Sequence, residues 1–276
     1  MVIVDVLLEP LQFSFMVRAL IVSVAVGIIA PVMGSYVVSR GLALMGDALS
    51  HAVLPGVVVA VLLGLNPVLG TIPVAIIMAV LIGYLSRRTG FSEDTTIGIL
   101  FVGLFALGLA ILSMARGLPI RLEDILLGQV LGVSWRDVYA TLGLGILALV
   151  LLYSFHKELV FATFDPIGAR VAGLRTGFLD NVLLAVLALV IVVALQAVGI
   201  ILVLAMLIVP AATARLLVRR FAPSMFVGAL LGIGVAIAGL YLSFYLNLPS
   251  GPAMTLVAVA FFAISVAIRR RAFWHA

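Results

Sequence analysis

Asp47 and His51 lie four residues apart in the stretch "MGDALSHAVLPG" (45–56), and both side chains are of types that bind metal ions. Residues at i and i+4 share one face of an α-helix, so we expect the carboxylate and the imidazole to lie side by side. This pair of ligands suits Mn²⁺, Zn²⁺ or Fe²⁺. Two ligands make a weak site, from which an ion can also leave. The spacing therefore predicts a transient site for a divalent metal ion at Asp47 and His51.

Two other interpretations of the pair stay open at this point. A neutral histidine bonded to the aspartate would simply join two helices. A catalytic metal site of the H-E-x-x-H type needs a second histidine one turn along the helix, and His156 and His275 are far away in the sequence. We expect these two histidines to be interfacial residues with no ligand role. The chain has no cysteine, so any metal must be held by oxygen or imidazole nitrogen.

The composition predicts the elements that must position the pair. Of the 276 residues, 65% are hydrophobic and 10% are charged, and the mean hydropathy is +1.40. Soluble domains carry about 25% charged residues. Because a membrane-spanning helix needs about 20 apolar residues, the sequence predicts an all-α, multi-pass protein of the cell membrane with about 8–9 spans. The expected spans are 14–38, 42–64, 67–85, 95–114, 136–155, 179–196, 198–218, 223–246 and 251–268. Pro55 and Gly56 should bend or interrupt the second one.

Basic residues lie at the ends of these segments, a pattern that predicts orientation. The net charge of +5 would suggest nucleic acid in a soluble chain, but here we expect no nucleic-acid partner and a lipid environment instead. Alternate ends should be cytoplasmic, namely those with Arg40, Arg87, Arg88, Lys157, Arg170, Arg175, Arg215, Arg219, Arg220 and Arg269 to Arg271. Arg18, Arg116, Arg121 and Arg136 should lie on the outer side. Nine spans would place the N-terminus outside.

The loop "KELVFATFDPIGARVAGL" (157–174) is predicted to contain a short helix. Asp165 is a good N-cap, Pro166 a natural first helical residue, and Gly173 a suitable end. This helix either lies on lipid or docks into a partner protein, and the small residues Gly168 and Ala169 would allow close approach. The chain has no G-x-x-x-x-G-K-[ST] loop. Transport driven by ATP would therefore need a separate ATPase subunit.

Six blocks in the right order resemble the manganese/zinc permease family of ABC importers. They are "GSYVVSRGLALMGDALSHAVLPG" (34–56), "SEDTTIGILFVGLFALG" (92–108), "EDILLGQVLGVSWRDV" (123–138), "ELVFATFDPIGARVAGL" (158–174), "VGIILVLAMLIVPAATARLL" (198–217) and "LSFYLNLPSGPAM" (242–254).

The resemblance implies a single permease domain over residues 1–276 with the type II importer fold. Two copies would pair with two ATPase subunits, and an external binding protein would deliver the metal. Asp47 and His51 match the family's polar intramembrane positions. Its coupling helix matches the segment within about 158–174, with Asp165, Pro166, Gly168, Ala169 and Arg170 as the expected contacts to the ATPase. The metal would be cargo, and no permanent cofactor is expected.

A secondary transporter driven by an ion gradient is the alternative function. Such proteins often show inverted repeats and several acids at the membrane midplane. Here Asp47 is the one acid deep in an apolar segment, and no convincing internal repeat is found. Co-purification with an ATPase would separate the two functions.

Overall fold

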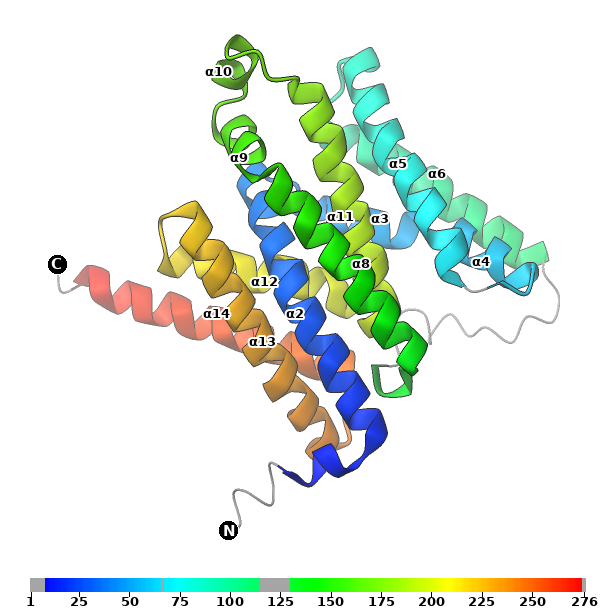
Figure 1. Cartoon of the computed structure of the whole chain (residues 1–276), viewed down its shortest axis with the longest axis vertical. Helices are drawn as coiled ribbons and strands as arrows, with labels where there is room; N and C mark the ends of the chain where they lie inside the picture. Colours follow the sequence, from blue (N-terminus) through cyan, green and yellow to red (C-terminus); the bar gives the residue numbers. More distant parts are fainter. Residues whose placement is uncertain (1–7, 66, 115–129, 275–276) are drawn as a thin grey trace. The chain divides into compact units, whose positions relative to one another are not determined.

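A computed structural model describes residues 8–65, 67–114 and 130–274, and these residues form helices and no strands (Figure 1). The predicted outer-side residues Arg116 and Arg121 lie outside the described residues, as does His275. The helices are α2 (Ser14–Arg40), α3 (Ala43–Ala52), α4 (Leu54–Leu62), α5 (Pro67–Thr89), α6 (Glu93–Met114), α8 (Trp135–Ser154), α9 (His156–Phe164), α10 (Pro166–Val171), α11 (Thr176–Val198), α12 (Ile200–Leu217), α13 (Phe221–Leu246) and α14 (Ser250–Trp274), with 3₁₀ turns at Pro10–Gln12 and Val130–Gly132.

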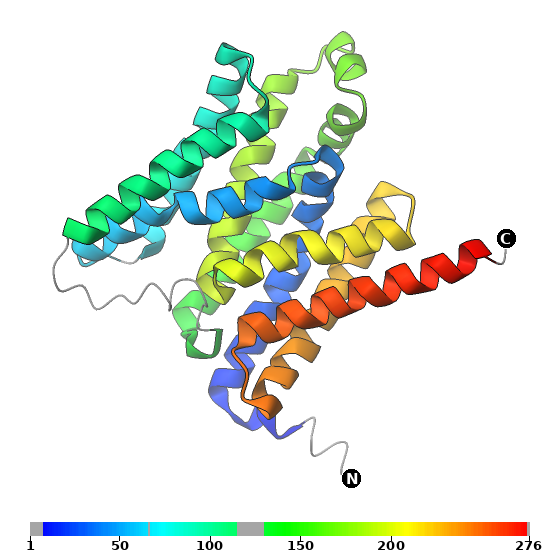
Figure 2. The same ribbon diagram turned by 180° about the vertical axis from the view of Figure 1, so that it is seen from behind.

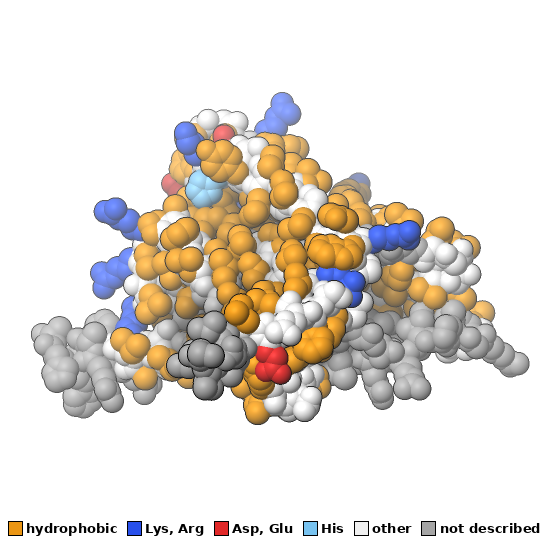
Figure 3. Space-filling model, turned by 60° about the horizontal axis from the view of Figure 1, so that its bottom comes forward, with side chains coloured by type: hydrophobic (Ala, Val, Ile, Leu, Met, Phe, Trp, Pro, Cys, Tyr) orange, Lys and Arg blue, Asp and Glu red, His pale blue; other side chains and the backbone are white. Residues whose placement is uncertain are grey.

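Eight helical segments in the described part of the chain are long and apolar enough to cross a membrane. One of them, Met45–Leu62, combines α3 and α4, and α12 contributes a shorter apolar stretch, Leu202–Leu217. The predicted all-α membrane protein with about 8–9 spans is confirmed. Apolar side chains also dominate the face shown in Figure 3. Such a surface suits lipid, since soluble monomers rarely expose large apolar patches.

The chain divides into two compact units, and the first is built on close helix crossings. It comprises residues 1–38, 122–145 and 193–276. Here α2 approaches α12 and α13 through glycines, because a Cβ on Gly34 would collide with the carbonyl of Leu207 and one on Gly232 with the carbonyl of Gly27. Small residues allow such backbone approach, and dispersion forces between the closely packed helices then hold them together.

The second unit, residues 39–121 and 146–192, contains both predicted functional segments. In it α4 packs against α5, and α6 packs against α3 and α4 (Figures 1 and 2). The crossing of α4 and α5 lies at Gly56 and Gly70, where a Cβ on either glycine would collide with the backbone of the other. This contact holds the helix that directly follows the Asp47–His51 segment.

The predicted interruption before Pro55 is confirmed. α3 ends at Ala52 and α4 begins at Leu54, with Pro55 in its first turn. Proline has no N–H, so residue 55 cannot donate to the carbonyl of His51 four residues earlier. The N–H of Val53 points to that carbonyl instead. The break therefore places His51 in the last turn of α3.

Candidate functional site

The predicted pair lies together on one face of α3. Oδ1 of Asp47 is 3.4 Å from Nε2 of His51, and the side chains are 45% and 22% exposed. An ion bound to both atoms at about 2.1 Å, the length of zinc–oxygen and zinc–nitrogen bonds, would make an angle of about 108°. This is close to tetrahedral, so the two side chains can share one ion with little rearrangement.

The opposite face of α3 anchors the helix. Met45, Leu49 and Ala52 are fully buried, and the hydroxyl of Ser50 donates to the carbonyl of Gly46 at 2.7 Å. Residues spaced by three and four share a face, so these three apolar side chains form one packed stripe. The packing fixes the rotation of α3 and leaves Asp47 accessible.

Two phenylalanines of α6 flank the imidazole of His51. The ring centroid of Phe105 lies 5.6 Å away in an edge-on arrangement, and that of Phe101 lies 5.9 Å away. Aromatic rings at this spacing attract one another through their quadrupoles and restrict the plane of each ring. Sequence reasoning did not find these residues, because two phenylalanines among 15 in an apolar chain give no distinguishing signal.

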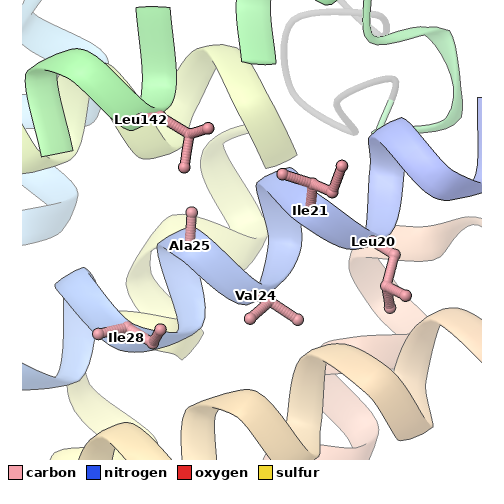
Figure 4. A pocket seen from close by; sticks show the side chains of 6 residues that line it. All are labelled: Leu20, Ile21, Val24, Ala25, Ile28 and Leu142. Atoms are coloured by element: carbon pink, nitrogen blue, oxygen red, sulfur yellow. The ribbon is translucent and has the colours of Figure 1, made fainter. Parts of the chain in front are cut away.

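No group of three or more His, Asp, Glu or Cys side chains that could hold a metal ion occurs in residues 8–65, 67–114 and 130–274. Within the described part of the chain, the site therefore has two candidate ligands, Asp47 and His51. The groove between α2 and α8 is not an alternative site (Figure 4). Its volume is about 360 Å³, and its lining is aliphatic: Leu20, Ile21, Val24, Ala25, Ile28 and Leu142.

The short helix predicted in the loop is confirmed as α10. The carboxylate of Asp165 accepts a hydrogen bond from the N–H of Gly168 at 2.8 Å, and Pro166 is the first helical residue. Gly173 has a φ of +86°, and the N–H groups of Gly173 and Leu174 donate to the carbonyls of Arg170 and Ala169. These two bonds form a Schellman motif, so both ends of α10 are capped.

The exposed surface of α10 differs from the expected one. Ala169 is fully buried, so it supports α10 on its own chain and cannot be the outward contact that its small size suggested. Ile167 and Val171 are instead 71% and 85% exposed, and Arg170 is exposed as well. Ile167 and Val171 are four residues apart and therefore share one helical face, and this spacing is the signal that sequence reasoning overlooked.

Residues 12–269 match the ABC 3 transport family. The chain is 43% identical to "Manganese transport system membrane protein MntC" of Halalkalibacterium halodurans, over 93% of this chain and 88% of that protein. It is 38% identical to "Chelated iron transport system membrane protein YfeD" of Yersinia pestis, over 94% and 86%. A chain in the solved structure "PsaBC from Streptococcus pneumoniae in complex with Fab" superposes with a TM-score of 0.84 at 36% identity, covering 95% of each chain.

Proposed function

Because the chain belongs to the ABC 3 transport family, we propose that it is the membrane-spanning subunit of an ATP-driven importer for a divalent transition-metal ion, Mn²⁺, Fe²⁺ or Zn²⁺. The observation that carries this proposal is the Asp47–His51 pair, with 3.4 Å between the two ligand atoms on a helix of a membrane span. The names of the manganese and iron relatives support a metal cargo.

The pair would act as a weak binding site on the path of the ion. A carboxylate attracts the cation and offsets part of its lost hydration, and the imidazole supplies a second ligand. Two protein ligands leave the coordination incomplete. We infer that a second copy of the chain supplies the same two side chains, so that a homodimer offers four. Neither copy alone would then hold the ion tightly, which allows its release.

ATP would be hydrolysed by a separate subunit, two copies of which bind the permease dimer, while an external binding protein supplies the metal. In this assembly α10 is the coupling helix. Ile167 and Val171 present exposed aliphatic surface, and the caps at both ends hold this short helix in one conformation. Burying an exposed aliphatic side chain contributes about 1.5–3 kcal/mol. These two side chains are therefore well suited to fill a cleft on the ATPase.

Reconstitution tests the function directly. The chain is expressed with the ATPase and binding protein of the same transport system and placed in vesicles, and uptake of each radiometal is measured. We expect uptake only when hydrolysable ATP is supplied on the side of the membrane where the ATPase is bound. We also expect the preferred ion to stimulate ATP hydrolysis. Uptake that follows an ion gradient and ignores ATP would overturn the proposal in favour of a secondary transporter.

Replacing Gly168 by leucine is expected to uncouple ATP hydrolysis from transport or to release the ATPase. A Cβ at this position would collide with the carboxylate of Asp165 that caps α10, so the cap must open. The exposed side chains are tested separately by Ile167→Ser and Val171→Ser. Each should lower the amount of ATPase retained on the purified permease by about tenfold or more, from the loss of buried aliphatic area.

The matched control is Leu217→Ser, which removes an exposed leucine at the end of α12. It should leave the complex intact. Normal transport by Gly168→Leu in a complex of normal composition would contradict the docking role of α10, as would equal losses in the control.

A further inference from the structure

Arg40, the last residue of α2, joins three segments of the second unit. Its Nη1 lies 2.6 Å from Oδ1 of Asp180 in α11, and its Nε donates to the hydroxyl of Thr163 in α9 at 3.0 Å. The side chain of Arg40 is 13% exposed and that of Asp180 is 31% exposed. The planar guanidinium therefore binds two partners at once, through two different nitrogens, in a largely covered position.

These two partners lie on either side of α10 in the sequence, one before it and one after it. Thr163 lies two residues before Asp165, the N-cap of α10, and its hydroxyl also donates to the carbonyl of Leu159. Asp180 lies in the first turns of α11, the helix that follows α10. A displacement of α10 must therefore act on the guanidinium from both sides.

In the other direction along the chain, Arg40 leads directly to α3, which carries the proposed metal-binding pair. Gly41 has a φ of +74°, where glycine avoids the steric cost of a side chain, and α3 begins at Ala43. Asp47 is thus seven residues from Arg40, along a connection that consists of one tight turn. Because this connection is so short, a shift of the guanidinium should also move the start of α3.

The arrangement also carries a cost that stability alone does not explain. Nη2 of Arg40 is buried and has no hydrogen-bond partner in the described part of the chain. Buried donors without partners are rare, because each loses its bonds to water. This N–H group is available to a partner in a second arrangement of the same helices.

We propose that Arg40 is a positioning residue that transmits the movement of α10 to α3 and thereby links ATP hydrolysis to passage of the metal past Asp47 and His51. This inference rests on the function proposed above. Asp180 and Thr163 are the two partners through which Arg40 does this. The three side chains act together, because each bond of the guanidinium fixes the geometry of the other.

The test measures the number of metal ions imported per ATP hydrolysed by the reconstituted complex. Arg40→Gln loses both bonds of the guanidinium, and Asp180→Asn loses the charge of one partner. Each should lower this ratio by about tenfold or more, the effect of at least one lost hydrogen bond to a charged group. The double variant should match the single ones, since groups that act as a unit are not additive. Thr163→Val keeps the shape of the side chain and should lower the ratio by a smaller factor.

One control variant and the outcomes that would contradict the inference make the test decisive. Arg219→Gln, at an exposed arginine beyond α12, should keep the ratio of the unaltered complex. An unchanged ratio in all variants of Arg40, Asp180 and Thr163 would overturn the inference. So would losses that multiply in the double variant, or a lower yield of complex with a normal ratio, which marks a purely structural contact. If the complex with Arg40→Gln does not assemble, the ratio measured for Thr163→Val decides whether the inference holds. Failure of the unaltered complex to import metal with ATP would instead refute the proposed function, and this inference with it.

Discussion

Replacing Asp47 by asparagine is expected to abolish metal uptake while expression and assembly with the ATPase stay normal. The amide keeps the shape of the side chain and removes its charge. The Coulomb energy between a unit charge and a divalent ion at 4 Å is about 8 kcal/mol at an effective dielectric constant of 20. Even a fifth of this energy changes a binding or rate constant by about tenfold. Radiometal uptake into vesicles measures the effect.

His51→Ala should have a similar effect, because it leaves one protein ligand per chain. The matched control is Asp137→Asn, which removes a carboxylate charge in the first turn of α8, in a part of the chain that belongs to the first compact unit. It should transport normally. If the shape-preserving double variant, Asp47→Asn with His51→Gln, keeps uptake within a few-fold of the unaltered protein, the pair only joins helices and the metal site is refuted.

Replacing Gly56 by alanine is expected to destabilise the protein by about 1–3 kcal/mol, the usual cost of inserting a methyl group into a packed interior. The added Cβ would collide with the carbonyl of Gly70, and this neighbour is backbone that cannot rotate away. α4 and α5 must therefore separate. Titration with denaturant in detergent micelles measures the free energy of unfolding, and transport should fall as well, because α4 continues from the segment of Asp47 and His51.

The control for this substitution is Gly103→Ala on α6, where a Cβ meets no atom within 4 Å. Glycine inside a helix costs about 1 kcal/mol relative to alanine, so this variant should gain stability. A gain of similar size for Gly56→Ala would show that the helices α4 and α5 are not held in contact at this crossing.

Local chemistry explains what could be predicted for the site. Asp47 and His51 share a face because any helix brings i and i+4 together, and the break follows because Pro55 lacks an N–H. α10 follows from a carboxylate N-cap, a proline at the first position and a glycine at the end. The spans follow from length and composition. None of these features depends on what lies elsewhere in the chain.

Long-range contacts were beyond the reach of the sequence. Arg40 meets partners 123 and 140 residues away, His51 meets two phenylalanines of α6, and Ala169 faces inward. The spans are apolar on nearly every side, so periodicity does not indicate which face packs against which neighbour. The sequence by itself determined that the chain is helical, where α10 begins and ends, and that Asp47 and His51 share one helix face, since these depend on neighbours within a few residues. Only the tertiary structure decided which helix faces meet, because in a chain of uniform hydrophobicity that choice depends on the close fit of glycines and side chains.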